Sequence, residues 1–266
     1  MARIISIANM KGGCGKTTVS VNLAAAMAVN QKYNTQRICV IDCDPQSNAT
    51  TALLQEGDEV GLSIYNILNN ESPPLDDCFY PTVHERLKLL PNILSSTSLE
   101  ISLAKGFPDS NTILRDALWE YLHEHFDIVL IDNNPTLGVM LNQSLCVSTE
   151  VFVIIEAGSS NSLLGIPELI KHISAIQETQ NPEIESIKVI INKLNRTRNA
   201  DKENLEDIYS EFGRESVYDV VIPMSADFRS VEKKTATTIM SYKNGRSRAA
   251  QAMRSLAISI FKEREG

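Results

Sequence analysis

The chain has 266 residues, 43% of them hydrophobic and 22% charged, which is enough to fill the core of one large α/β domain or two small ones. It contains no apolar run near the length of about 20 residues that a membrane-spanning helix needs. Five cysteines at scattered spacings predict neither a disulfide framework nor a zinc site, and we expect a cytoplasmic protein without a signal peptide.

The formal net charge of −8 excludes a protein that is basic over its whole surface. The charge is unevenly distributed, because residues 1–185 contain 10 Lys and Arg against 22 Asp and Glu, whereas residues 186–266 contain 15 against 11. The C-terminal part is therefore basic, and such a region can draw a polyanion to one face of an otherwise acidic protein.

The first predicted elements are a buried strand at residues 4–8, a glycine-rich loop, and an alanine-rich helix at residues 19–29. Gly-Lys-Thr at residues 15–17, between the strand and the helix, is typical of a phosphate-binding loop. Its glycines let backbone N–H groups turn toward an anion, and the helix N-terminus adds partial positive charge. In such a loop Lys16 reaches the β- and γ-phosphates, and the hydroxyl of Thr17 binds Mg²⁺.

The spacing of this loop departs from the general pattern of Gly, four residues and Gly-Lys-Ser/Thr. Counting back from Gly15 places Met10 at the first-glycine position, and a second lysine, Lys11, lies inside the loop. The sequence Lys-Gly-Gly-Cys-Gly-Lys-Thr-Thr resembles the deviant Walker A motif of the ParA/MinD family of P-loop ATPases, whose signature is the early lysine. The resemblance implies an ATP site formed by Lys11, Gly12, Gly13, Cys14, Gly15, Lys16, Thr17, Thr18, Asn192, Pro223 and Met224.

A second buried strand is predicted at residues 37–42, and Asp42 and Asp44 follow at its carboxyl end, where α/β sheets bind their ligands. An Asp-x-Asp-Pro turn is equally typical of a loop with helix-capping side chains. The family resemblance implies that Asp44 orients the attacking water and is catalytic together with Lys11 and Lys16. It further implies that Asp42 supports the water shell of Mg²⁺, and that Gln46 and Asn48 belong to a nucleotide-sensing switch.

A helix is predicted at residues 112–125, followed by an apolar strand at 127–132. An apolar run that ends in aspartate forms a Walker B pattern, so Asp132 is expected to hold Mg²⁺ through water, opposite Thr17. The metal site is therefore expected at Thr17, Asp42 and Asp132. Residues 133–138 resemble the second switch of the family, although Asn134 replaces one of its two prolines and loosens the backbone there.

Further apolar strands are predicted at residues 151–155, 187–191 and 217–222, with a helix at 162–177 between the first two. This alternation predicts an α/β fold with a doubly wound, mostly parallel sheet and helices on both faces. Asn192, directly after the strand at residues 187–191, either hydrogen-bonds an adenine edge or caps a turn. The family places Pro223 and Met224 near the base. We expect residues 1–266 to form a single ATPase domain, without a separate N-terminal DNA-reading domain.

Basic residues gather in the C-terminal part, with few aromatic residues between them, so base stacking on single strands is not expected. They form either a solvated basic face or a surface for phosphate contacts that do not read sequence. ParA proteins bind DNA nonspecifically in this region, as a patch that spans an ATP-bound homodimer. The candidate DNA-binding residues are Arg196, Arg198, Arg229, Lys233, Lys234, Arg246 and Arg248.

The last predicted helix, at residues 246–265, distinguishes the two branches of the family. MinD proteins end in an amphipathic membrane-targeting helix, whereas here acidic residues follow the apolar positions and would oppose an anionic bilayer. We therefore expect a ParA-like, nucleoid-associated partition ATPase that uses ATP and Mg²⁺ and is stimulated by a ParB-like adaptor. A MinD-like positioning ATPase bound to the membrane is the alternative.

Overall fold

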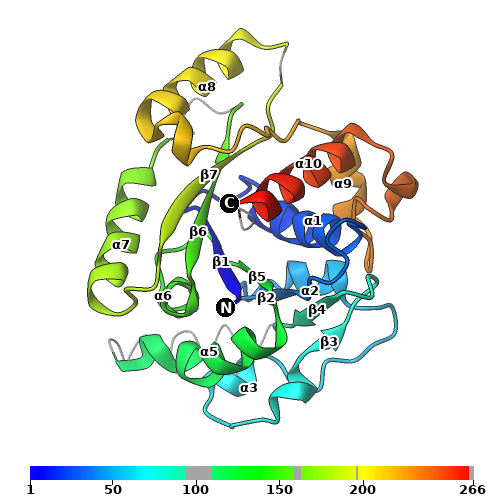
Figure 1. Ribbon diagram of the computed structural model, residues 1–266, viewed down its shortest axis with the longest axis vertical. Helices are drawn as coiled ribbons and strands as arrows, with labels where there is room; N and C mark the ends of the chain where they lie inside the picture. The colour runs from blue at the N-terminus through cyan, green and yellow to red at the C-terminus, as the bar shows by residue number, and fades with distance from the viewer. Residues whose placement is uncertain (94–102, 104–108, 159–162, 196, 264–266) are drawn as a thin grey trace.

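Seven strands form one sheet in the computed structural model, which describes residues 1–93, 103, 109–158, 163–195 and 197–263. The strand order is β3-β4-β2-β5-β1-β6-β7, and every pair is parallel except β3 with β4 (Figure 1). The bounds are β1 Arg3–Ala8, β2 Ile38–Asp42, β3 Tyr80–Pro81, β4 Leu87–Leu90, β5 Ile128–Asp132, β6 Glu150–Glu156 and β7 Ser186–Asn192. The predicted doubly wound, mostly parallel sheet is confirmed.

The strands are almost wholly apolar because helices cover both faces of the sheet. One face carries α1 (Lys16–Ala28), α2 (Asn48–Leu53), α9 (Ala226–Glu232) and α10 (Arg248–Lys262). The other carries α3 (Ile64–Leu68), α5 (Ile113–His125), α6 (Val139–Val147), α7 (Ile166–Thr179) and α8 (Asn199–Phe212). Short 3₁₀ turns lie at Leu75–Cys78, Asp109–Thr112, Arg214–Ser216 and Tyr242–Gly245.

The strand order reverses around β1, which lies between β5 and β6. Helix α1 connects β1 to β2, on the β5 side of β1 in the strand order. Helix α6 connects β5 to β6, which lies on the opposite side of β1 (Figure 1). Two chain segments therefore leave the carboxyl edge in opposite directions at this point. In open α/β sheets, such a switch point is where ligands bind.

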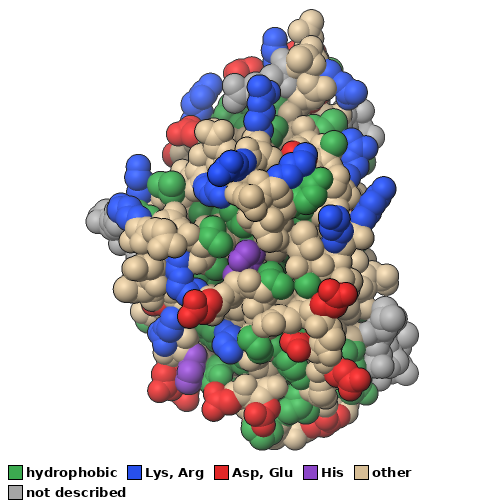
Figure 2. Space-filling view, turned by 90° about the vertical axis from the view of Figure 1, so that its right-hand side faces the viewer, with side chains coloured by type: hydrophobic (Ala, Val, Ile, Leu, Met, Phe, Trp, Pro, Cys, Tyr) green, Lys and Arg blue, Asp and Glu red, His purple; other side chains and the backbone are tan. Residues whose placement is uncertain are grey.

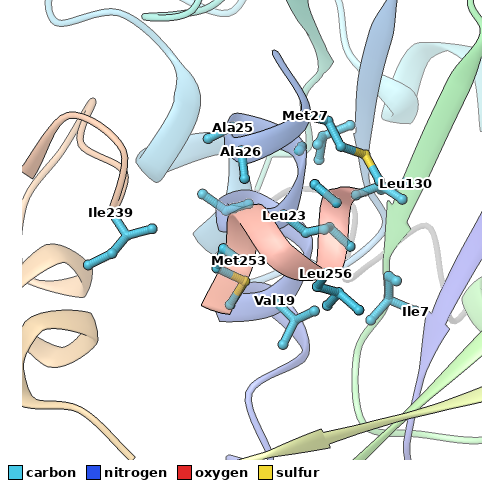
Figure 3. Close-up of a cluster of buried hydrophobic side chains, with 14 of the residues drawn as sticks. Ile7, Val19, Leu23, Ala25, Ala26, Met27, Leu130, Ile239, Met253 and Leu256 are labelled. Atoms are coloured by element: carbon cyan, nitrogen blue, oxygen red, sulfur yellow. The ribbon is translucent and has the colours of Figure 1, made fainter. Parts of the chain in front are cut away.

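Helix α1 is buried nearly all round, because β1 and β5 cover one side of it and α10 covers the other. Figure 3 shows Leu23 and Met27 of α1 among Leu130 of β5 and Met253 and Leu256 of α10. The small side chains of residues 24–26 are fully buried, and their size allows the neighbouring elements to approach the α1 backbone closely. This packing fixes the N-terminal end of α1 relative to the sheet.

Charged groups hold the C-terminal end of α10 against the sheet. The Arg3 guanidinium donates hydrogen bonds to both oxygens of Glu150, at 2.5 and 2.7 Å, and to the carbonyl of Ile260 at 2.6 Å. It also contacts Glu263 at 3.1 Å, and the Tyr218 hydroxyl donates to the same carboxylate at 2.8 Å. Helix α10 thus packs its apolar face on α1 and is anchored at its end. Among the described residues, no helix has the length and apolar character needed to cross a membrane.

The strand predicted at residues 217–222 is broken. Val217 and Pro223 make single bridges to Val189 and Leu194. The Tyr218 N–H donates to the carbonyl of Val189 and the Ile222 N–H to that of Ile191, at 3.0 and 2.9 Å. This segment therefore uses three intervening residues where β7 uses one, and the extra residues interrupt the ladder.

The packing of α10 on α1 predicts a large difference between two apolar positions of α10. Leu256 is fully buried, whereas Ile258 is 37% exposed. We expect Leu256→Ala to lower the free energy of unfolding by about 2–5 kcal/mol through the cavity it leaves. Ile258→Ala should change it by less than about 1 kcal/mol. Urea unfolding followed by circular dichroism measures both, and equal effects would contradict the burial of this face.

Candidate active site

The glycine-rich loop joins the end of β1 to the start of α1 in a conformation that depends on glycine. Gly13 and Gly15 have φ angles of 74° and 99°, in the left-handed region that L side chains avoid. A Cβ atom added to Gly15 would lie 2.2 Å from Nδ2 of Asn192, so the approach of β7 also requires glycine there. The backbone N–H groups of the first turn of α1 follow directly and form an anion-binding end.

Lys16 is 6% exposed, and its ammonium folds back over the loop. Its Nζ donates to the carbonyls of Asn9 and Lys11 at 3.0 and 3.4 Å. Asn9 ties the loop to β6, because its Oδ1 accepts a hydrogen bond from the Lys11 N–H at 2.7 Å and its Nδ2 donates one to the carbonyl of Ile154. Sequence reasoning missed this asparagine, since its role depends on the pairing of β1 with β6. Phosphate oxygens can replace the two carbonyls as partners of Lys16.

Asp42 and Asp132 are neighbours in register at the ends of β2 and β5, and both are fully buried. Burial raises the pKa of Asp132 to about 6. Burial also raises the pKa of Asp42 to about 7, and the adjacent charge of Asp132 adds to the effect. The two buried carboxyl groups thus lie side by side, and a cation beside them would favour their charged forms.

Asp42 and Asp132 differ in their hydrogen-bond partners, which gives them different roles. Asp42 accepts from the N–H and hydroxyl of Thr50 at 2.8 and 2.7 Å and from the Asp44 N–H at 3.1 Å, so it holds the start of α2. Asp132 accepts from the Ser20 hydroxyl at 2.9 Å through Oδ1, while its Oδ2 is buried without a hydrogen-bond partner among the described residues. The unmatched oxygen of Asp132 fits a hydrated divalent cation, with the Thr17 hydroxyl as the second group.

A cavity of about 880 Å³ opens in front of the loop, a volume typical of small-molecule sites. Asp44 lies at its wall, 9% exposed, and its Oδ1 accepts from the Gln46 N–H at 2.9 Å. Sequence reasoning did not identify Glu156, Lys193 and Phe228, which also line it. The predicted ATP-site residues in its wall are Gly12, Gly13, Gly15, Lys16, Thr17, Thr18, Asn192, Pro223 and Met224.

The two other predicted ATP-site residues contribute differently. The Cys14 side chain is fully buried, and the carbonyl of this residue accepts from Asn192 Nδ2 at 2.8 Å. Lys11 Nζ lies 3.1 Å from a carboxylate oxygen of Glu156 in the same chain. Asn192 thus supports the loop through Cys14 and caps its own turn, because its Oδ1 accepts from the Lys193 N–H at 2.9 Å.

Most of the basic candidates lie near α9 and α10: Arg229 is in α9, Lys233 and Lys234 follow it, and Arg246 and Arg248 lie at the start of α10, whereas Arg198 precedes α8. Figure 2 views the side that carries α9 and α10, and Lys and Arg gather in its upper half while Asp and Glu gather in the lower half. Arg229 and Lys234 also line the cavity, so they border both the cavity and the surface. Arg196 lies outside the described residues. The exposed candidates are Arg198, Arg229, Lys233, Lys234, Arg246 and Arg248.

Comparisons with known proteins agree with this geometry. A family model described as an AAA domain matches residues 2–186. The chain is 30% identical over 260 residues to the sporulation initiation inhibitor protein Soj of Bacillus subtilis, a match that covers 98% of each chain. The chain belongs to the ParA/MinD family of P-loop ATPases. It is also 31% identical to the chromosome partitioning protein ParA of Caulobacter vibrioides, over 83% of this chain and 80% of that one.

Solved structures support the same fold at lower identity. The cobyrinic acid a,c-diamide synthase of Mycobacterium smegmatis, with bound ADP and magnesium, superposes with a TM-score of 0.81 at 24% identity, covering 100% of this chain and 96% of that one. A putative plasmid partition protein of Borrelia burgdorferi bound to AMPPNP gives 0.78 at 20% identity, with 99% and 100% covered. As a member of the family, the chain is an ATPase.

The two glycines at positions 12 and 15 provide a matched test of the loop geometry. Gly15→Ala should lower the free energy of unfolding by about 1–3 kcal/mol, because alanine is strained at φ 99° and displaces the Asn192 amide. Gly12 has no heavy atom of the described residues within 4 Å of an added Cβ and no left-handed φ. Gly12→Ala should therefore stay within about 0.5 kcal/mol in the same denaturant titration.

Proposed function

We propose that this protein is a ParA-like partition ATPase, which binds DNA nonspecifically as an ATP-bound homodimer and moves or positions a DNA cargo. The observation that carries the proposal is a two-lysine phosphate loop beside buried, unmatched Asp132, in a chain whose exposed cations gather around α9 and α10. Relatives described as chromosome partitioning proteins support the same role. In this proposal residues 1–266 act as a single ATPase domain, cytoplasmic and associated with the nucleoid.

The nucleotide chemistry uses residues already in place. Lys16 exchanges its loop carbonyls for the β- and γ-phosphates, and the N-terminal N–H groups of α1 bind the same oxygens. Asp132 and Thr17 would hold Mg²⁺, with Asp42 behind them fixing the start of α2. When bound, Mg²⁺ supplies positive charge that the phosphates and the buried acids share. Asp44 orients the attacking water from the wall of the cavity, and Asn192, Pro223 and Met224, which line the same cavity, would contact the base.

Dimerisation and DNA binding follow from the same loop. Two subunits close face to face, and Lys11 leaves Glu156 to reach the phosphates of the other subunit. The charge that Lys11 neutralises increases in the transition state, so this contact serves both assembly and hydrolysis. The dimer duplicates the basic surface, and two weak sites on one duplex bind far more tightly than one. A ParB-like adaptor then stimulates hydrolysis and releases the DNA.

The alternative is a MinD-like positioning ATPase that binds the membrane through its last helix. Burial of the apolar face of α10 on α1, with Arg3 anchoring its end, favours the DNA-binding form. A membrane-binding α10 would have to leave this core first.

We expect the protein to bind a random-sequence DNA duplex with ATP but not with ADP or without nucleotide. The affinity should fall steeply with added salt, since each neutralised phosphate releases counterions. Lys11→Ala should abolish the ATP dependence by preventing dimer formation. Filter binding or fluorescence anisotropy across a salt series measures this. If the protein hydrolyses ATP but binds no DNA in any nucleotide state, the DNA role is wrong.

The basic surface is tested by reversing charges on two opposite faces. Arg246→Glu combined with Arg248→Glu should weaken DNA binding by at least about tenfold and reduce the salt dependence, because both residues are exposed beside α10. Lys171→Glu changes an exposed lysine on α7, which covers the other face of the sheet. This control should bind DNA like the unmodified protein. Because the control reverses one charge and the double variant reverses two, a free-energy loss in the control about half that of the double variant would indicate an effect of net charge alone.

The roles of the two acids can be separated by isosteric changes. Asp44→Asn should keep ATP binding and reduce hydrolysis by about 100-fold or more, since it removes the group that orients water. Asp132→Asn should instead abolish the increase in ATP affinity that Mg²⁺ provides. Calorimetric titrations with and without Mg²⁺, together with phosphate release, distinguish the two outcomes. Loss of Mg²⁺-dependent binding in Asp44→Asn would reverse these assignments.

A further inference from the structure

Lys193 lies across the phosphate-binding loop, although no part of the function proposed above uses it. Its Nζ donates a hydrogen bond to the carbonyl of Gly13, and its Cε lies 3.9 Å from the position a Cβ would take on Gly15. The side chain therefore crosses from the end of β7 over the loop. It lines the same cavity as the loop residues and is 35% exposed.

The backbone of Lys193 is held in an unfavourable conformation that directs this side chain. Its φ of 57° is left-handed, which a residue other than glycine adopts at an energetic cost. The side-chain oxygen Oδ1 of Asn192 accepts a hydrogen bond from the Lys193 backbone N–H and fixes the turn. Such strained residues concentrate at binding and catalytic sites, where the surrounding structure maintains them. Here the same asparagine also holds the loop through Cys14, so Lys193 and the loop are positioned together.

Glu156 at the end of β6 pairs with two lysines of the loop region at once. One of its carboxylate oxygens lies 3.1 Å from Lys11 Nζ and the other lies 3.8 Å from Lys193 Nζ. The carboxylate is 19% exposed and lines the cavity. It therefore occupies a position that a polyanionic ligand would approach, and it provides there the negative charge that both lysines need while no phosphate is present.

We propose that Lys193 is a third phosphate-binding lysine of this site, held by Glu156 until the β- and γ-phosphates of ATP replace that carboxylate. A phosphate chain carries more negative charge than one carboxylate and repels Glu156, so the lysines change partners when the nucleotide enters. The existing ion pairs are partly solvated and are given up at little cost. The inference rests on nucleotide binding by this ATPase and is independent of its DNA role.

The test compares nucleotides of different phosphate length on the full chain. Lys193→Gln should weaken Mg·ATP binding by about tenfold, as expected for one charge-assisted hydrogen bond. It should weaken ADP binding less and leave AMP unchanged. Glu156→Gln should act in the opposite direction and tighten ATP binding, because the lysines lose their competing partner. Isothermal titration calorimetry measures the dissociation constants, and Lys193→Arg should restore most of the ATP affinity.

The matched control is Lys188→Gln, the same change on β7, the strand that Lys193 directly follows. The Lys188 ammonium contacts the carbonyl of Glu215 at 2.8 Å rather than the loop, so nucleotide binding should not change. Thermal unfolding without nucleotide tests whether Lys193 only supports the loop. An equal loss of affinity for ATP, ADP and AMP in Lys193→Gln overturns the proposal, as does weaker ATP binding in Glu156→Gln. Failure of DNA binding, with this pattern intact, overturns only the partition role.

Discussion

The position of the phosphate-binding loop depends on how closely α1 packs between the sheet and α10. Residues 24–26 are alanines, and their size allows the helix to be covered on both sides without displacing either neighbour. The N-terminal end of α1 is thereby fixed at the switch point beside β1, where Gly15 meets Asn192. A larger side chain in the helix would move the loop, although it would lie more than a full turn away from any phosphate.

The charges at the carboxyl edge of the sheet balance one another inside the protein when no nucleotide is bound. Lys16 donates to loop carbonyls, Lys11 pairs with Glu156, and Lys193 donates to the carbonyl of Gly13 and lies 3.8 Å from Glu156. Asp132 is the exception, because one of its buried oxygens lacks a hydrogen-bond partner among the described residues. In the proposed ATP complex the three lysines would therefore exchange existing partners for phosphate oxygens, whereas Asp132 offers a hydrated cation an oxygen without a partner among the described residues.

The sequence alone predicts much of the fold because its signals are local. Each central strand is a continuous apolar run, and the loop with Lys11 and Lys16 lies within one short segment. The expected strands at residues 4–8, 37–42 and 127–132 accordingly appear as β1, β2 and β5. Their arrangement at one edge follows from the rule that parallel strands end together.

What sequence reasoning missed depends on contacts between distant segments. Asn9 gains its role from the strand next to its own, and Glu156 meets Lys11 only because β6 lies beside β1. The strand breaks at residues 217–222 because this segment has more residues between its hydrogen bonds than β7 has. Hydrophobic patterning predicts a strand but not the register of its pairing. The short antiparallel strand β3 consists of two residues and has no periodic signal.

Helix α9 lies between the cavity and the basic surface, so it can couple binding at one to binding at the other. It borders the nucleotide cavity on one side and the exposed basic surface on the other, and the Thr18 hydroxyl of α1 donates to Glu232 at its end. Under the proposed function, nucleotide and DNA share this short helix, and they cannot bind independently if either one changes its position. By reciprocity, the factor by which ATP changes the affinity for DNA equals the factor by which DNA changes the affinity for ATP. In the proposed DNA-bound dimer, DNA would then change the affinity of each subunit for its nucleotide by that factor.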